Sequence, residues 1–273
     1  MMRRVATDGM TRLAVLAAMV GAVMAADARA AAPPAPEPRL VAWGGVEDAK
    51  RWARGRSGSV SFAVADGRRV RGLAVDRRYP SASVVKAMLA LAVVRSARGR
   101  ELTSGERALL GPMIRVSDNA AASTLYRRVG GLRLERLAEV AGMTRFADVG
   151  YWADAQITAA DQARLFLRID RLAPRRHRSY LRRLLASIVG WQRWGIAPVA
   201  EERGFTIMFK GGWRTRIAHQ VALLERDGRR IALAVLTSGT GDAYGRATQA
   251  GIAARVLARR QARGRPGTST AAG

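Results

Sequence analysis

Residues 83–94 read Ser-Val-Val-Lys-Ala-Met-Leu-Ala-Leu-Ala-Val-Val, and Lys86 is the only polar side chain after Ser83. A helix that is apolar on every side is buried inside a protein. A buried ammonium group must find partners or lose its proton. Ser83 lies three residues earlier, on the same face of the expected helix. The stretch therefore predicts a buried helix in which a lysine can reach a serine hydroxyl. The alternative is a lysine that extends from a partly exposed helix into solvent.

Lysine is rare in this chain, which has 47 basic residues and only three lysines: Lys50, Lys86 and Lys210. Arginine stays charged, whereas a desolvated lysine has a lowered pKa and can act as a base. A lysine that acts as a base beside a serine can activate the serine hydroxyl as a nucleophile. The two lysines at Lys86 and Lys210 are therefore candidate functional residues.

Two further motifs follow along the chain. Ser117-Asp118-Asn119 also suits the N-terminal cap of a helix over 120–129, and Lys210-Gly211-Gly212 also suits a turn. The order Ser-x-x-Lys, Ser-Asp-Asn and Lys-x-Gly is more specific than any one motif. Over about residues 40–260 it resembles the active-site serine enzymes that include class A β-lactamases and penicillin-binding proteins.

The resemblance implies a role for each motif residue. Ser83 would be the acylated nucleophile and Lys86 its proton acceptor. Ser117 would pass a proton to the leaving nitrogen, while Asn119 would hold the amide side chain of the substrate. Lys210 would supply positive charge to Ser117 and to an anionic substrate group.

The resemblance also implies an oxyanion hole made by the backbone N–H groups of Ser83 and Trp213. Gly212 would lie beside the substrate. The family usually has a hydroxyl residue where this chain has Gly211, so recognition of a substrate carboxylate would pass to Arg214 or Arg216, with Thr215 as a further option. Asp118 is expected to cap a helix and not to react.

Class A β-lactamases carry a loop glutamate that activates the water for deacylation. The corresponding stretch here, 148–156, contains no glutamate, and none occurs between Phe146 and Asp161. Asp148, Asp154 or Gln156 could replace it, although each also suits a loop. The missing base predicts slow release of an acyl-enzyme.

Apolar runs predict the fold. Two Asp-Gly turns, Asp66-Gly67 and Asp227-Gly228, each join two apolar runs as a hairpin would. A fifth strand is expected over 205–209. We expect an α/β (α+β) domain with one antiparallel sheet of about five strands. N- and C-terminal helices pack on the sheet, and a helical lobe is inserted over 83–196.

The N-terminus has the pattern of an export signal. Arginines precede an apolar run of 14 residues, 13–26, which ends near Ala28-Arg29-Ala30. This run is shorter than the ~20 residues that span a bilayer. Residues 1–30 are therefore predicted to be a cleaved signal peptide, in preference to an uncleaved membrane anchor. A secreted or extracytoplasmic location is therefore expected.

Composition divides the rest of the chain. Residues 31–38 form a Pro/Ala linker, 39–262 the hydrolase domain and 263–273 a disordered tail. The chain has no cysteine and two histidines, so no metal and no cofactor are expected. His219 suits a buried strand position, and His177, in an arginine-rich segment, is expected to be exposed.

The formal net charge of +26 would attract the protein to anionic surfaces such as the cell wall. The arginine-rich segment 175–185 suits either a basic amphipathic helix on an anionic surface or a solvated helix face. No pattern for specific nucleic-acid recognition is present. A monomer is expected.

These observations predict an exported serine hydrolase, and the expected substrate is a small-molecule β-lactam or a peptidoglycan stem peptide. The motif order favours a β-lactamase-like enzyme. The missing glutamate favours a DD-peptidase or penicillin-binding protein. A third possibility, from another class, is a non-catalytic basic protein with the same fold that binds the cell wall. The intact Ser83, Lys86, Ser117 and Lys210 argue against it, because a binding protein does not need all four.

Overall fold

The computed structural model describes residues 43–67 and 69–258. The described residues belong to one compact unit. The predicted signal peptide, the linker and the tail after residue 262 lie outside the described residues. Within the described part of the chain, no helix is long and apolar enough to cross a membrane.

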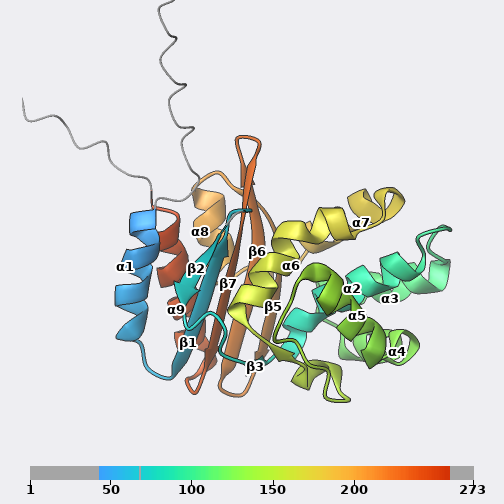
Figure 1. Ribbon diagram of the computed structural model, residues 1–273, viewed down its shortest axis with the longest axis horizontal. Helices are drawn as coiled ribbons and strands as arrows, with labels where there is room; N and C mark the ends of the chain where they lie inside the picture. The colour runs from blue at the N-terminus through green and yellow to red at the C-terminus, as the bar shows by residue number, and fades with distance from the viewer. Residues whose placement is uncertain (1–42, 68, 259–273) are drawn as a thin grey trace, which may run out of the picture. The chain divides into compact units, whose positions relative to one another are not determined.

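A single five-stranded antiparallel sheet forms the centre of this unit, as the sequence predicts (Figure 1). Its order is β2-β1-β7-β6-β5. The strands are β1 Ser59–Ala65, β2 Val70–Leu73, β5 Thr206–Arg214, β6 Ile217–Arg226 and β7 Arg229–Ser238. Asp227 and Gly228 both have positive φ angles, 54° and 71°, which suits the two-residue turn expected between β6 and β7.

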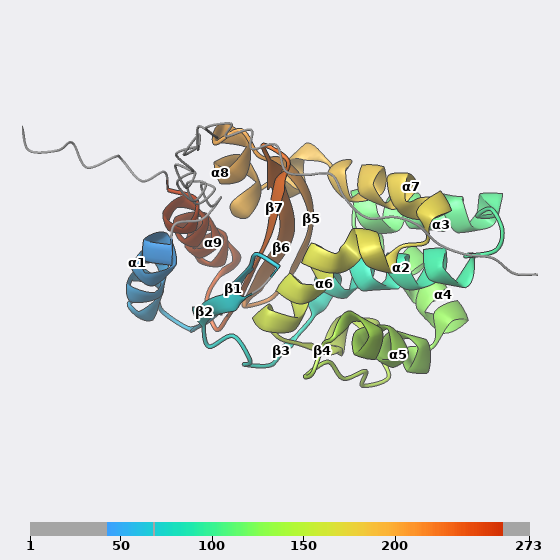
Figure 2. The same ribbon diagram turned by 45° about the horizontal axis from the view of Figure 1, so that its top comes forward.

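Helices cover both faces of the sheet (Figures 1 and 2). One face carries α1 Trp43–Arg54, α8 Ile196–Glu202 and α9 Asp242–Val256, and α1 packs along α9. The other face is covered by α6 Ala159–Leu172, which packs on β1, β6 and β7. The terminal helices therefore pack as predicted.

The inserted lobe lies beyond α6 (Figure 2). Its helices are α2 Val85–Ser96, α3 Ser104–Arg115, α4 Asn119–Val129, α5 Gly131–Ala141 and α7 Arg175–Ala186. Short segments connect them: η1 Ala82–Val84, η2 Trp152–Asp154, η3 Gly190–Gln192 and the strand pair β3 Tyr79–Pro80 and β4 Gln156–Ile157. Residues 85–94 of α2 are all buried, which confirms the prediction from its sequence.

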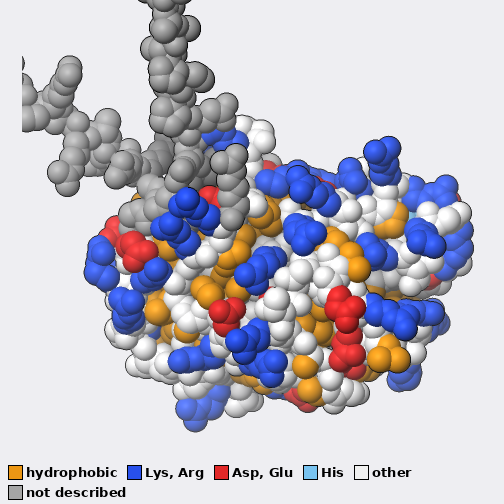
Figure 3. Space-filling view, in the orientation of Figure 1, with side chains coloured by type: hydrophobic (Ala, Val, Ile, Leu, Met, Phe, Trp, Pro, Cys, Tyr) orange, Lys and Arg blue, Asp and Glu red, His pale blue; other side chains and the backbone are white. Residues whose placement is uncertain are grey.

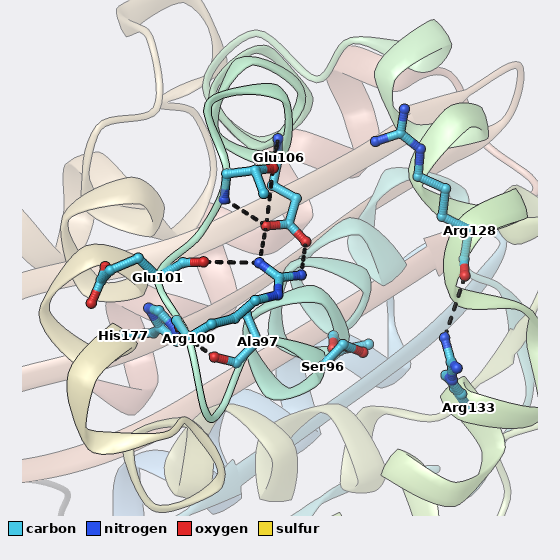
Figure 4. A network of polar contacts seen from close by, with 10 residues as sticks. Ser96, Ala97, Arg100, Glu101, Glu106, Arg128, Arg133 and His177 are labelled. Carbon is cyan, nitrogen blue, oxygen red and sulfur yellow. Dashed lines mark hydrogen bonds and ion pairs between the residues drawn. The ribbon is translucent and has the colours of Figure 1, made fainter.

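The prediction that His177 is exposed is wrong, because only 2% of its surface is accessible. His177 lies in α7 on the same face as the buried Leu181 and Leu185, four and eight residues later. Its Nε2 atom lies 3.0 Å from the carbonyl oxygens of Ala97 and Arg100, which follow α2 (Figure 4). The apolar face of α7 is thus packed in the core and is not available to an anionic surface.

His219 is a buried strand histidine, as predicted. It lies in β6, where its Nδ1 atom accepts a hydrogen bond from the Thr237 N–H at 3.1 Å. Its Nε2 atom then donates to the Pro80 carbonyl at 3.0 Å. Burial lowers the pKa of His219 to about 4, so the ring is neutral and structural.

Candidate active site

Ser83 lies at the start of the buried helix. It is the middle residue of η1, which leads directly into α2. Ser83 is partly exposed, whereas Val84 and Val85 are buried. The preceding residue, Ala82, has a positive φ of 44°, a strained conformation that is often found at functional sites. The local fold therefore presents one accessible hydroxyl at the N-terminal end of an apolar helix.

Lys86 is fully buried and bonds to neutral oxygen atoms. Its Nζ atom donates to the Ser117 carbonyl at 2.6 Å, to Asn119 Oδ1 at 2.7 Å and to Ser117 Oγ at 3.2 Å. The ammonium also lies 4.6 Å from the centre of the Trp152 ring. Burial lowers the pKa of Lys86 to about 7, although the nearby Asp118 carboxylate partly opposes this. A large neutral fraction of Lys86 is therefore present near pH 7.

The expected contact between Ser83 and Lys86 is not a hydrogen bond in this conformation. Among residues 43–67 and 69–258, no hydrogen bond joins the Ser83 hydroxyl to Lys86 Nζ. The lysine reaches instead to Ser117 on the loop before α4 and to Asn119 at the first position of α4, which together offer three acceptor oxygens. A carbonyl and an amide oxygen can satisfy a buried ammonium more fully than one hydroxyl can.

Ser117 connects the two lysines. Lys210 lies in β5 and is fully buried, and its Nζ atom donates to Ser117 Oγ at 3.2 Å and to the Gly211 carbonyl at 2.9 Å. Burial holds the pKa of Lys210 well below its usual value, and the charge of Lys86 lowers it further. Ser117 itself has a positive φ of 61°. Asp118 caps α4 by accepting from the Ala121 N–H at 2.7 Å, as predicted.

Gly212 allows β5 to approach η1, the short segment that contains Ser83 and leads into α2. A Cβ atom at this position would lie 2.8 Å from the backbone nitrogens of Ser83 and Val84, too close for any side chain. The next residue of β5 is Trp213. Backbone N–H groups of Ser83 and Trp213 therefore belong to two segments in direct contact, as an oxyanion hole of two donors requires.

Trp194 explains the glycine at position 211. A Cβ atom on Gly211 would lie 3.0 Å from two carbons of the Trp194 ring, so the indole takes the space of a side chain there. Trp213 packs edge-on against Trp194 and Trp191, with ring centres 6.1 and 5.8 Å apart. Trp191 is 61% exposed. The sequence reasoning missed this aromatic group, although three of the six tryptophans fall within 191–213.

Both arginines that were predicted to bind substrate have partners within the protein. Arg214 forms an exposed ion pair with Asp154 at 2.6 Å, which joins the end of β5 to η2. Arg216 donates to the Gly239 carbonyl at 2.7 Å. Arg214 is thus neutralised by a carboxylate, while Arg216 keeps an uncompensated charge among the described residues.

The loop residues that could replace a glutamate are also engaged. Asp148 accepts from the Tyr126 hydroxyl at 2.9 and 2.7 Å, and burial together with this carboxylate raises the pKa of Tyr126 to about 12. Gln156 donates to the Asp154 carbonyl at 2.8 Å. In the part of the chain that the structure describes, none of Asp148, Asp154 and Gln156 bonds to a lysine or serine of the site. Nor do three histidine or acidic side chains gather there as metal ligands.

Comparison with known proteins agrees with this architecture. Residues 105–259, more than half of the chain, match the β-lactamase enzyme family (Beta-lactamase2). The structure is similar to a β-lactamase from Sphaerobacter thermophilus, at 21% identity and a TM-score of 0.68, covering 80% of this chain and 97% of the other. It is also similar to a class A β-lactamase from Mycobacterium abscessus, at 20% identity and a TM-score of 0.66, covering 78% and 98%.

PBP-A is a third structural relative, at 15% identity and a TM-score of 0.68, covering 78% of this chain and 94% of PBP-A. A mutant of PBP-A is described as an acyl-enzyme complex with penicillin G. No curated protein sequence matches the chain. The protein belongs to the β-lactamase enzyme family and is a serine hydrolase of the β-lactamase and penicillin-binding protein superfamily. The matched range contains Ser117, Asn119 and Lys210 and begins after Ser83 and Lys86.

Proposed function

We propose that this protein is an exported serine hydrolase that forms an acyl-enzyme on Ser83 with a β-lactam or a related cell-wall peptide amide or ester. One observation carries the proposal. The Ser117 hydroxyl lies 3.2 Å from both Lys86 Nζ and Lys210 Nζ. Neither buried lysine has a carboxylate hydrogen-bond partner among the described residues. Two lysines with lowered pKa on one hydroxyl suit proton transfer better than they suit stabilisation of the fold.

Acylation follows from this arrangement. Neutral Lys86 accepts the Ser83 proton as Ser83 Oγ attacks the carbonyl carbon and a C–O bond forms. The negative charge on the carbonyl oxygen is held by the N–H groups of Ser83 and Trp213. When the C–N bond breaks, Ser117 gives its proton to the leaving nitrogen. Lys86 then returns the proton it took to Ser117, so that both residues regain their starting state.

Lys210 and the tryptophans define the rest of the proposed cleft. Lys210 keeps Ser117 oriented and adds positive potential for an anionic substrate group. Gly211 brings no hydroxyl to a substrate carboxylate, and Trp194 fills the space where one would stand. Arg216 retains charge for that group. Asn119 accepts from Lys86 through Oδ1 at 2.7 Å and would also bind the substrate amide.

Deacylation is expected to be slow. Water attack on the ester needs a positioned base, which typically contributes ~10²–10⁴-fold. No glutamate occurs in 146–161. The contacts of Asp148 with Tyr126 and of Asp154 with Arg214 support the view that neither carboxylate is free for that role.

A DD-peptidase-like or penicillin-binding function is the second candidate, and the same missing base favours it. Such an enzyme acts on peptidoglycan stem peptides and is trapped by β-lactams. The structural similarity to PBP-A and the acyl-enzyme complex of its mutant with penicillin G support this candidate. The two candidates share the acylation step and differ in the acyl donor that turns over.

Export is proposed from residues 1–30 alone. We expect cleavage near Ala30, which N-terminal sequencing of the secreted chain would show. A mature N-terminus at Met1 would remove this part of the proposal. We also expect adsorption to anionic cell wall that weakens as salt rises, since exposed charges are screened over ~8 Å at physiological ionic strength. Adsorption that is unchanged by salt would contradict the electrostatic contact.

Labelling with a fluorescent penicillin tests the function. The adduct is expected on Ser83, and peptide mapping would locate it. Ser81→Ala is a matched control, because Ser81 is a buried neighbour whose hydroxyl donates to the Trp152 carbonyl at 3.0 Å. An adduct on Ser81 or Ser117, or labelling that survives Ser83→Ala, would overturn the assignment.

A further inference from the structure

A large basic cavity lies outside the candidate active site. It has a volume of about 1190 Å³ and is bounded by the β1–β2 hairpin, α6, α7 and the start of β7. Seven arginines and two aspartates are among its lining residues. The arginines are Arg69, Arg164, Arg168, Arg171, Arg178, Arg182 and Arg230. Basic side chains gather over α6 and α7 on this face of the molecule (Figure 3).

Helical periodicity builds the cavity wall. On α6, arginines recur at 164, 168 and 171, and on α7 at 178 and 182, so that each helix turns one row of guanidinium groups toward the same space. Arg69 lies in the β1–β2 hairpin, and Arg230 lies in β7 beside the β6–β7 turn. The cluster therefore depends on the folding of segments that are far apart in the sequence.

Carboxylates hold part of the cluster in place. Asp170 accepts from Arg182 at 2.5 Å and from Arg230 at 3.1 Å. Glu225 also contacts both, with Arg230 at 3.2 Å. Arg164 pairs with Asp161 at 3.2 Å. These three arginines are fixed and largely neutralised.

The other wall arginines on the helices lack acidic partners among the described residues. Arg168 donates to the Ala141 carbonyl, a neutral acceptor, at 2.9 Å. Arg171 makes no hydrogen bond in the described part of the chain and is exposed. Arg178 has its Nε atom buried without any partner. A buried donor without an acceptor is unfavourable, and like charges in one cavity repel each other. Arg168, Arg171 and Arg178 thus present positive charge that no acidic side chain of the described residues neutralises.

We propose that this cavity binds a soluble ligand that carries two or more phosphate groups. Guanidinium groups match phosphate oxygens in planar, paired hydrogen bonds. Three unpaired arginines on two helices suit a ligand with several phosphates, and the volume exceeds the ~300–1000 Å³ of ordinary small-molecule sites. The arginines paired with Asp170 and Glu225 form a rigid floor beneath the ligand.

Calorimetry with inorganic tripolyphosphate at fixed ionic strength tests the proposal. The double variant Arg171→Gln/Arg178→Gln removes two guanidinium groups that make no hydrogen bond within the described protein. The matched control is Arg127→Gln/Arg128→Gln on α4, which changes the charge equally at exposed positions outside the cavity. We expect saturable binding that weakens by about tenfold or more in the cavity variant and stays within about twofold in the control, because charge-assisted bonds are local.

Equal weakening in both variants would mean attraction to the general basic surface and would overturn the proposal. The absence of saturable tripolyphosphate binding would also overturn it. So would a protein that binds the polyanion heparin but not tripolyphosphate, if the cavity variant binds heparin as tightly as the unaltered protein. If the double variant does not fold, the exposed single variant Arg171→Gln carries the same test against Arg127→Gln. Acylation by penicillin is measured separately, so this proposal and the proposed function can fail independently.

Discussion

The candidate active site and the arginine-lined cavity both gather basic side chains, but of different kinds. In the active site, Lys86 and Lys210 are fully buried, and neutral oxygens are their hydrogen-bond acceptors. In the cavity, the arginines are partly buried or exposed, and two of them, Arg182 and Arg230, are held by Asp170 and Glu225.

The difference in side chain and burial corresponds to two functions of basic residues, proton exchange and anion binding. Burial lowers the pKa of a lysine until the group can exchange a proton, and the pKa of Lys86 falls to about 7. Arginine keeps its charge in any such setting and therefore suits binding of anions. The two buried lysines, Lys86 and Lys210, thus indicate the candidate site more clearly than the far more numerous arginines do.

The largest expected effect distinguishes the two regions by chemistry. Ser83→Ala should lower acylation by about 10⁴-fold or more, as loss of a covalent nucleophile does. Arg171→Gln/Arg178→Gln should leave acylation unchanged, because the cavity shares no residue with the active site. Stopped-flow acylation rates with a chromogenic β-lactam measure both. A comparable loss in the cavity variant would break the separation.

Exchanging the two kinds of cation gives the next effect. Lys86→Arg should be nearly as damaging as Lys86→Ala, at ~10²–10⁴-fold, because arginine cannot accept the Ser83 proton and its larger head must be buried. Acylation rates and circular dichroism of both variants provide the measurement. Retention of most of the acylation rate by the arginine variant would leave Lys86 a purely electrostatic role.

The pH dependence sharpens the same contrast. Acylation should rise with pH through about 7 and then level off, because the neutral form of Lys86 is the base. Between pH 6 and 8 the increase should be about tenfold. Since the unfolded lysine keeps its usual higher pKa, the unfolded state binds more protons above pH 7. The free energy of unfolding should therefore also rise with pH in that range. A flat acylation profile would exclude Lys86 as the titrating base.

A smaller effect concerns packing beside Lys210. Gly211→Ser should lower the free energy of unfolding by about 1–3 kcal/mol, because the new Cβ atom meets Trp194. The loss should shrink in a Trp194→Phe background, where the ring is smaller. Urea unfolding of the two single variants and the double variant measures this coupling. Equal losses in both backgrounds would show that Trp194 does not determine the glycine.

The smallest effect is expected at the exposed ion pair. Asp154→Asn should change the free energy of unfolding by about 0–1 kcal/mol, as exposed pairs do. It should also leave the lifetime of the acyl adduct unchanged, because Asp154 is bonded to Arg214. Arg214→Gln serves as the control for loss of the pair. A longer-lived adduct in Asp154→Asn alone would identify Asp154 as the deacylation base.

The sequence contained enough to predict the sheet and the buried helix. Alternating turns and apolar runs placed the two hairpins, and the unbroken apolar stretch of α2 predicted its burial. The order of three short motifs then indicated the superfamily. These are local or linear signals, which do not require knowledge of the tertiary packing.

Signals that depend on packing were missed or wrong. His177 looked exposed among arginines, but it falls on the inward face of α7. The sequence did not indicate that Lys86 donates to Ser117, before α4, and to Asn119, its first residue. The contact between Trp194 and Gly211 joins two segments whose approach no short-range pattern indicates.

Intact mass spectrometry during reaction with a chromogenic β-lactam tests the central claim most directly. We expect a burst of about one equivalent of product, followed by slow steady turnover, since a missing base slows deacylation by ~10²–10⁴-fold. Throughout that phase the protein should carry one acyl adduct, which maps to Ser83 and is absent from Ser83→Ala. Fast hydrolysis without a burst or a detectable adduct would contradict slow release, and an adduct elsewhere would contradict Ser83 as the nucleophile.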